Sequence, residues 1–319
     1  MLSPKTLQTR GTRALLALLA LCGGVLGGCR KAAAPAEDAA RGPVYAPTPS
    51  AEAKHTVVRF AIHPLHNPSK LMHDYQPLID YLSANIPGTR FEVEASRDYQ
   101  EYERKIDRHD PEFLLPNPWQ SLEAMKAGYE VIAMAGEPED FKGLIIVRRD
   151  SGIREVADLR GKSLAYPSHT ALAACIMPQW FLHTRGLNVN RDITNRYVGS
   201  QESAIMNTYL RVTAAGVTWP PPWRAFQSEH PAEAAQLRVM WETESLLNNS
   251  VMARKDLPAG LGARVRQLLL ELHQKPAGRD ILAGIETARF LPATDADYDA
   301  VRQFVARFET EVRPVKTPP

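Results

Sequence analysis

The chain of 319 residues has only three cysteines, no long apolar run and almost no net charge. Cys22 and Cys29 both fall within the first thirty residues, which leaves Cys175 as the one thiol of the rest of the chain. No intrachain disulfide is therefore expected, and packing must hold the fold together. The apolar run at residues 14–29 is too short to cross a bilayer, so a transmembrane anchor is not expected either.

The N-terminus is typical of an exported lipoprotein. Three basic residues precede the apolar run, and the run closes on Leu-Gly-Gly-Cys at residues 26–29, which resembles a bacterial lipobox. We expect a signal peptide over residues 1–28 and acylation of Cys29, which would place the protein on the periplasmic face of a bacterial membrane, inner or outer. Residues 29–54 are rich in Ala and Pro and predict a flexible tether.

Charge excludes one class of partner. Removing the three basic residues before Cys29 leaves 35 Lys and Arg against 36 Asp and Glu, and no basic block remains. Nucleic acid is therefore not an expected partner. The remaining length exceeds one typical domain and fits two lobes in a monomer.

Hydrophobic patterning predicts two α/β units followed by a helical tail. Strands are expected at residues 56–64, 90–95, 112–117, 129–136, 141–150, 162–167, 194–199, 212–219, 236–243 and 248–257. Helices fill most intervals, which favours mostly parallel sheets, and the last 60 residues are predicted to be helical. We assign residues 55–147 and 250–312 to one lobe and 148–249 to the other. Two crossings, near 146–152 and 244–252, imply a hinge and an interlobe cleft.

Signatures of catalysis are missing. The chain contains no Gly-x-Ser-x-Gly, His-Glu-x-x-His or Gly-x-Gly-x-x-Gly, and "LRGKS" at 159–163 lacks the opening glycine of a phosphate-binding loop. His63 and His66 flank Pro64 without further metal ligands nearby, so a place at the cleft rim is favoured over a metal site. Cys175 lies in an apolar stretch and is expected to be a buried hydrophobe. We predict no enzyme, no metal and no cofactor.

Residues 167–178, "PSHTALAACIMP", follow the predicted strand 162–167 and open a helix. Free backbone N–H groups at such a turn often bind anions. The first helical turn is nevertheless Ala-Leu-Ala-Ala, without the hydroxyls expected around a phosphate. The turn is therefore expected to face a ligand that is not bare phosphate.

Tryptophans stand close to the ends of predicted strands. Trp219 ends one strand and Trp223 follows it by a helical turn, while Trp119 and Trp180 lie early in helices that follow strands. Convergence of these ends on one crevice would give it aromatic walls suited to apolar, flat or cationic ligands. Packing of the same residues in the core is the alternative reading.

Several segments together resemble the phosphate/phosphite/phosphonate-binding family of periplasmic substrate-binding proteins. They include "FAIHP", "LMHDYQPLIDYL", "LPNPWQSLEAMKAGYEVIA", "YVGSQESAIMNTYL", "LPATDADYDAVRQF" and the stretch from Phe141 to Leu187, and they cover most of residues 56–312. The resemblance implies an α/β, two-lobed, type-two periplasmic binding protein fold with an interlobe cleft and C-terminal helices. It also implies delivery of a ligand to an ABC permease.

The anion-binding positions of that family are occupied differently here. The resemblance aligns its hydroxyl run with Ala171, Leu172 and Ala173, a histidine with Gln201, an acidic residue with Thr213 and an aromatic residue with Pro116. Each lost hydroxyl contact to a charged oxygen would be worth about 1.5–3 kcal/mol.

The sequence thus predicts a lipid-anchored solute-binding protein of a phosphonate-type ABC transporter. Two alternatives stay open: a carrier of an apolar, amphipathic or cationic organic ligand for another envelope transporter, and a ligand-binding sensor partner. The residues expected to bind the ligand are His66, Asn117, Trp119, Tyr166, Ser168, His169, Thr170, Ser200, Gln201, Thr213, Trp219 and Trp223.

Overall fold

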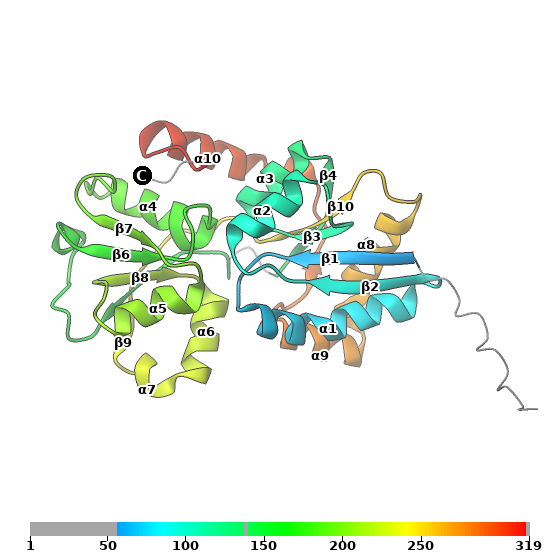
Figure 1. Ribbon diagram of the computed structural model, residues 1–319, viewed down its shortest axis with the longest axis horizontal. Helices are drawn as coiled ribbons and strands as arrows, with labels where there is room; N and C mark the ends of the chain where they lie inside the picture. Colours follow the sequence, from blue (N-terminus) through cyan, green and yellow to red (C-terminus); the bar gives the residue numbers. More distant parts are fainter. Residues whose placement is uncertain (1–55, 137–139, 317–319) are drawn as a thin grey trace, which may run out of the picture. The chain divides into compact units, whose positions relative to one another are not determined.

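The structure, a computed structural model, describes residues 56–136 and 140–316. The predicted signal peptide, Cys29 and the tether lie outside the described residues. Two β-sheets, each covered by helices, make up the described chain (Figure 1).

The first sheet has six strands in the order β11-β4-β10-β3-β1-β2. They are β1 (Thr56–Ile62), β2 (Thr89–Glu94), β3 (Phe113–Leu115), β4 (Tyr129–Ala135), β10 (Ser250–Arg254) and β11 (Phe290–Leu291). β1 pairs in parallel with β2 and β3, whereas β10 runs antiparallel to β3 and β4. The sheet is thus mixed rather than mostly parallel, because the chain returns to it from the second sheet in the opposite direction.

The second sheet has five strands in the order β7-β6-β8-β5-β9. They are β5 (Leu144–Arg148), β6 (Ser163–Tyr166), β7 (Thr194–Tyr197), β8 (Ala215–Thr218) and β9 (Leu237–Glu242). β6 is parallel to β7 and β8, and β5 is antiparallel to β8 and β9.

The chain passes between the sheets twice, between β4 and β5 and again between β9 and β10. Because β5 pairs with β8 and β9, residues 144–148 lie in the second sheet, whereas the sequence had assigned all of 55–147 to the first lobe. The apolar run of β5 predicts a strand correctly, but it does not indicate which strands pair with β5.

Helices cover both faces of the first sheet. They are α1 (Pro68–Asn85), α2 (Tyr99–Asp107), α3 (Pro118–Lys126), α8 (Leu261–Glu271), α9 (Pro276–Gly284) and α10 (Asp299–Glu311), with 3₁₀ turns η4 (Leu272–Gln274) and η5 (Asp295–Tyr298). α1, α8 and α9 pack together on one face, and α2, α3 and α10 on the other (Figure 1). The apolar stripe predicted for α1 is buried, namely Leu71, Tyr75, Leu78, Ile79 and Leu82.

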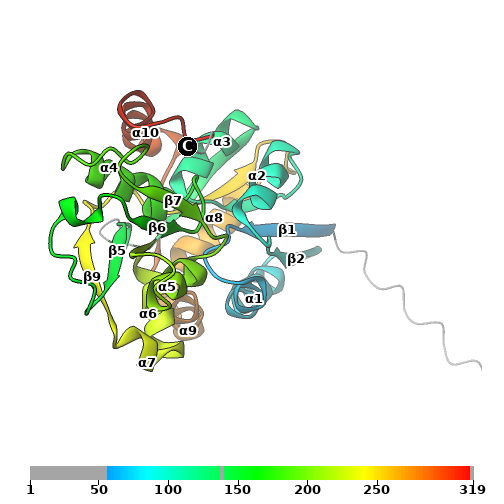
Figure 2. The same cartoon turned by 60° about the vertical axis from the view of Figure 1, so that its left-hand side comes forward.

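The second sheet is covered by α4 (Met177–His183), α5 (Gln201–Tyr209), α6 (Pro220–Glu229) and α7 (Pro231–Ala234), and the 3₁₀ turn η2 (Val156–Leu159) precedes β6. α4 lies on the face opposite to α5 and α6 (Figure 2). A π-helical turn, η3 (Leu172–Ile176), precedes α4. Pro178 has no N–H and its ring crowds the carbonyl four residues earlier, which explains the delayed α-helix that the sequence predicted.

The apolar core of the first sheet extends across to the second. Leu172, Ala173, Ile176 and Met177 of the η3–α4 segment belong to the same buried cluster as the strands of the first sheet, and so does Trp219. Leu172 and Ala173 of the run that replaces the expected hydroxyls therefore pack between the two halves of the fold, whereas Ala171 lies in the core of the second sheet.

Candidate ligand-binding site

Asn117 is placed by the N-terminus of α3. Its Oδ1 accepts from the Gln120 backbone N–H at 3.0 Å, and the Gln120 side chain accepts from the Asn117 N–H at 3.1 Å, so the two form a capping box. The remaining Nδ2 donates to the backbone carbonyl of Thr170 at 3.3 Å. A residue after β3 of the first sheet is thereby joined to the turn after β6 of the second.

Ser168 and Thr170 lie in that turn, and both are buried. Their hydroxyl oxygens are 2.9 Å apart, and the Thr170 backbone N–H donates to Ser168 Oγ at 3.3 Å. The Thr170 hydroxyl also donates to Glu103 Oε1 at 2.6 Å. The turn is therefore hydrogen-bonded to a carboxylate of α2, a helix that packs on the first sheet.

Glu103 was not identified from the sequence. Gln120 Nε2 donates to the same Oε1 at 3.1 Å. Burial raises the pKa of Glu103 to about 6, against the opposing effect of the bonds from Thr170 and Gln120. The helical spacing of α2 could have indicated it. Glu103 follows buried Tyr99 by four residues and precedes buried Ile106 by three, so it borders the apolar face of α2.

A second set of contacts joins the sheets around Gln201, the first residue of α5. Gln201 Nε2 donates to the Tyr99 hydroxyl at 3.0 Å, and Gln201 Oε1 accepts from Thr218 at 2.9 Å. Next to Thr218, the ring of Trp219 lies 6.5 Å from His63 and 5.5 Å from Phe141, measured between centroids. These residues form an almost dry contact between the two halves.

Cavities lie on either side of this contact. One of about 320 Å³ is lined by Gln100, Glu103, Ile106, Asp107, Trp119, Glu123, His169, Thr170 and Lys316. A smaller one of about 20 Å³ includes His66, Ser200 and Gln201 among its lining residues. The larger cavity has the volume of a small organic ligand.

The histidines near the cleft are neutral at pH 7. Burial lowers the pKa of His63 to about 4 and that of His66 to about 3, and burial also lowers the pKa of His169. His63 Nδ1 lies 3.0 Å from the Leu115 carbonyl, which fixes the proton on that nitrogen. None of these side chains therefore offers a positive charge to an anion.

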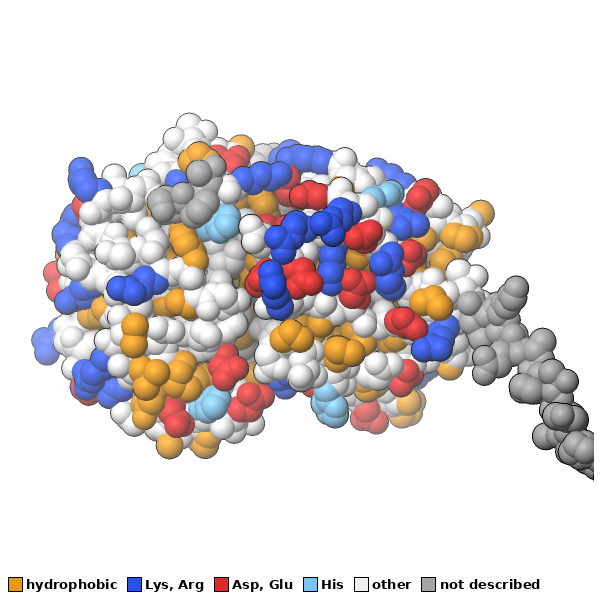
Figure 3. Space-filling view, viewed as in Figure 1, with side chains coloured by type: hydrophobic (Ala, Val, Ile, Leu, Met, Phe, Trp, Pro, Cys, Tyr) orange, Lys and Arg blue, Asp and Glu red, His pale blue; other side chains and the backbone are white. Residues whose placement is uncertain are grey.

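On the face drawn in Figure 3, acidic and basic side chains are interspersed. Within residues 56–136 and 140–316, no group of three or more His, Cys, Asp or Glu side chains is arranged to hold a metal ion. Over the same residues, no helix is both long and apolar enough to cross a membrane.

The structure brings nine of the twelve predicted ligand residues to the boundary between the sheets and places three elsewhere. Those at the boundary are His66, Asn117, Trp119, Ser168, His169, Thr170, Ser200, Gln201 and Trp219. Trp223 stacks on Phe226, at 6.0 Å, within the core under the second sheet. Tyr166 is fully buried beside Tyr197, and its hydroxyl has no hydrogen-bond partner among the described residues.

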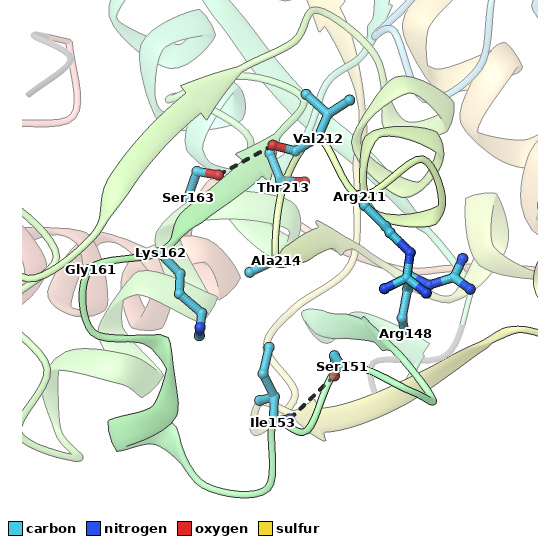
Figure 4. A pocket seen from close by; sticks show the side chains of 10 residues that line it. All are labelled: Arg148, Ser151, Ile153, Gly161, Lys162, Ser163, Arg211, Val212, Thr213 and Ala214. Carbon is cyan, nitrogen blue, oxygen red and sulfur yellow. Dashed lines mark hydrogen bonds between the residues drawn. The ribbon is translucent and has the colours of Figure 1, made fainter.

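Thr213 precedes β8 and so lies at the opposite end of that strand from Thr218. It lines a separate cavity of about 380 Å³ with Arg148, Lys162 and Arg211 (Figure 4). Arg148 and Arg211 both pair with Asp150, at 2.9 and 2.5 Å. The structure thus does not bring Thr213 together with the residues at the boundary.

The chain passes between the two sheets twice, and contacts near the ends of β3, β6 and β8 join them. This arrangement is the fold of a periplasmic binding protein. The chain belongs to the family of ABC transporter, phosphonate, periplasmic substrate-binding proteins, whose family model matches residues 60–298. The family and fold class predicted from the sequence are confirmed. Proteins of this family are substrate-binding components of transporters, which are not enzymes. Membership in the family implies a small-molecule ligand and a permease partner.

Solved structures share the fold at low sequence identity. PhnD1 from Prochlorococcus marinus (MIT 9301), solved with methylphosphonate, is 16% identical with a TM-score of 0.73, over 81% of this chain and 99% of that chain. A binding protein component of an ABC phosphonate transporter from Pseudomonas aeruginosa is 15% identical with a TM-score of 0.72, over 80% and 87% of the two chains.

A curated relative belongs to a different system. The tetrathionate sensor histidine kinase TtrS of Salmonella typhimurium is 26% identical over 140 residues, which are 41% of this chain. The match covers 24% of the kinase, so this chain spans about a quarter of the length of that relative.

Proposed function

We propose that this protein is the lipid-anchored solute-binding component of a phosphonate-type ABC transporter and that its two sheet units close over a small molecule. The family match supports the class. The observation that carries the site is the meeting of Asn117, Thr170 and Gln201 with partners from the opposite half. The ligand would lie at this boundary and be handed to the permease after opening.

The lipobox-like segment supports acylation of Cys29, and the two passages of the chain between the sheets support a hinge. A lipidated N-terminus would hold the binding unit near its permease through the tether. Mass spectrometry of the mature N-terminus tests this anchor, because an unmodified residue there would contradict it. Closure around the ligand is the general behaviour of two-lobed binding proteins.

A paired substitution tests the site. Ligand at 100 times its dissociation constant should stabilise the wild type by about 2.7 kcal/mol, seen as a rise in melting temperature in a screen of phosphate, phosphonates, quaternary amines and lipids. Thr170→Ala should remove most of this rise, because Thr170 lies at the boundary. Thr213→Ala makes the same chemical change away from the boundary and should keep it. The opposite pattern would place the ligand near Thr213 instead.

Two other functions have support of their own. The carboxylate of Glu103 beside Trp119 favours a cationic or amphipathic organic ligand. The match to a sensor kinase favours a ligand-binding partner of a sensor. A neighbouring permease and ATPase gene pair would favour the transporter, and a neighbouring sensor kinase gene would favour the sensor.

A further inference from the structure

We propose that Glu103 sets the ligand charge that the cleft accepts, so that the Ser168–Thr170 turn receives an ammonium-bearing ligand and rejects a free oxyanion. The inference rests on the proposed function, because it concerns the same site. It begins from the hydrogen bonds of the turn.

The hydroxyl donors of the turn are already used. Thr170 donates its proton to Glu103 Oε1, so Ser168 must donate to Thr170 Oγ1. The hydroxyl protons of Ser168 and Thr170, which could otherwise hold an oxyanion, are therefore used in a series of hydrogen bonds that ends on the carboxylate of Glu103. An incoming oxyanion would have to displace Glu103, and it would also be repelled by that charge.

The one cation among the residues that line the cavity is already paired. Lys316 is that residue, and its Nζ lies 2.6 Å from Glu123, which also pairs with Lys126 at 2.7 Å. The buried Arg313 donates to the His169 carbonyl at 3.0 Å but is not among the lining residues. Burial lowers the pKa of His169, so its ring adds no positive charge near pH 7.5. Glu103, Asp107 and Glu123 outnumber Lys316, so the lining residues carry an excess of negative charge.

The apolar wall of the cavity suits an organic cation. Trp119 is 4% exposed and lines the cavity together with Ile106. A primary or quaternary ammonium group gains from an aromatic face and from an adjacent carboxylate at the same time. The shared feature of the accepted ligands is thus the ammonium group, whatever the rest of the molecule carries.

A purely mechanical role for Glu103 predicts a different result. If the carboxylate only fastened α2 to the turn, its replacement would weaken all ligands or none, and their relative affinities would stay constant. Glu103→Gln keeps the shape and an acceptor for Thr170 while it removes the charge. Glu101→Gln removes the same charge two residues away, where the carboxylate accepts from the Arg97 backbone N–H at 2.9 Å and lies 3.9 Å from the Arg97 guanidinium.

The experiment measures dissociation constants by calorimetry for three probes: methylphosphonate, choline and 2-aminoethylphosphonate. In the wild type near pH 7.5, at least one ammonium probe should bind about tenfold or more tighter than methylphosphonate. Glu103→Gln should strengthen methylphosphonate and weaken the ammonium probes, each by about tenfold, and Glu101→Gln should change neither ratio by more than about twofold. The choline and 2-aminoethylphosphonate arms distinguish a quaternary from a primary ammonium ligand.

The outcomes separate the two proposals. If a probe binds and Thr170→Ala abolishes its binding, but Glu103→Gln leaves the affinity ratios unchanged, the site stands and the role of Glu103 is overturned. If no probe binds to any variant, both this inference and the proposed function for these ligands are overturned. Should Glu103→Gln fail to fold, binding of choline to the wild type at about pH 5 replaces it, since choline keeps its charge while Glu103 is protonated, and an unchanged choline affinity there would again overturn the inference.

Discussion

At the scale of single residues, Glu103 joins binding to stability. Its carboxylate is largely removed from water, and desolvation raises its pKa to about 6 from an ordinary value of 4.5. Between these two values the folded protein binds more protons than the unfolded chain. Stability from this group is therefore present at low pH and is lost as the pH rises through 6.

We accordingly expect Glu103→Gln to stabilise the protein at neutral pH. A shift of this size corresponds to about 2 kcal/mol in the free energy of unfolding near pH 7.5, and the gain should vanish near pH 4, where the carboxyl is protonated in both states. Urea unfolding of both proteins at the two pH values measures the difference. Glu101→Gln serves as the exposed control, and a Glu103→Gln variant less stable than wild type near pH 7.5 would refute the expectation.

Single residues also mark what the sequence could and could not predict. Asn117 and Thr170 were identified because each follows a strand, and the carboxyl ends of strands are positions that local patterns reveal. Glu103 was not predicted as a site residue, because its contact with Thr170 depends on how the two halves pack against each other. Thr213 was chosen because the resemblance aligns it with an acidic residue on the strand expected at 212–219, but β8 begins only at Ala215.

At the scale of elements, the segment after α10 ties the two halves together. Arg313 is 4% exposed and has no carboxylate partner among the described residues. Its guanidinium donates to Gln179 at 2.8 Å and to the His169 carbonyl at 3.0 Å, while Val315 is buried in the core around the first sheet. A helix packed on the first sheet is thereby anchored to the Ser168–Thr170 turn of the second.

Arg313→Ala should lower the free energy of unfolding by about 2–4 kcal/mol, because it leaves the Gln179 and His169 oxygens buried without their donor. Chemical denaturation measures this change. Arg307 on α10 is the matched control, because it is exposed and lies over the Trp180 ring at 4.9 Å. Its replacement by Ala should cost less than about 1 kcal/mol. Equal losses in the two variants would mean that the Arg313 contacts contribute nothing beyond surface packing.

Elements were easier to predict than their pairing. The delayed helix before α4 followed from Pro178, and the buried stripe of α1 from its spacing. The membership of β5 in the second sheet and the short β11 did not follow, because both depend on strands distant in sequence. Antiparallel partners for β10 likewise come from the path of the chain between the sheets.

At the scale of the whole binding unit, polar contacts join the two halves at several points, among them the bonds of Arg313 and the ion pairs Lys70–Glu229 and Arg224–Glu286. Besides the bonds to Thr170, Gln201 joins the second sheet to Tyr99 of α2. Gln201 is 3% exposed, so its amide has no access to water while this contact exists. In an opened arrangement the same amide would be hydrated. In the proposed hinge motion, contacts of this kind favour the closed form over the open form.

Tyr99→Phe should shift that equilibrium toward the open form. The buried Gln201 Nε2 loses its acceptor only when the halves are together, at a cost of about 1–3 kcal/mol, so the ratio of closed to open forms falls by about fivefold or more. Small-angle X-ray scattering should show a larger radius of gyration without ligand, restored at saturation. The ligand concentration needed for half-saturation should rise in proportion as the closed fraction falls, because binding must now supply the closing free energy.

The control for this change lies within one half. Tyr81 accepts a hydrogen bond from Lys275 at 3.0 Å, and both residues belong to the elements around the first sheet. Tyr81→Phe removes an equivalent hydroxyl without touching the boundary, so radius and affinity should both match the wild type. If Tyr99→Phe also matches the wild type in both measurements, the contact at Gln201 does not govern closure, and the other contacts between the halves must carry it, such as the bonds of Asn117 and Glu103 to Thr170 and those of Arg313.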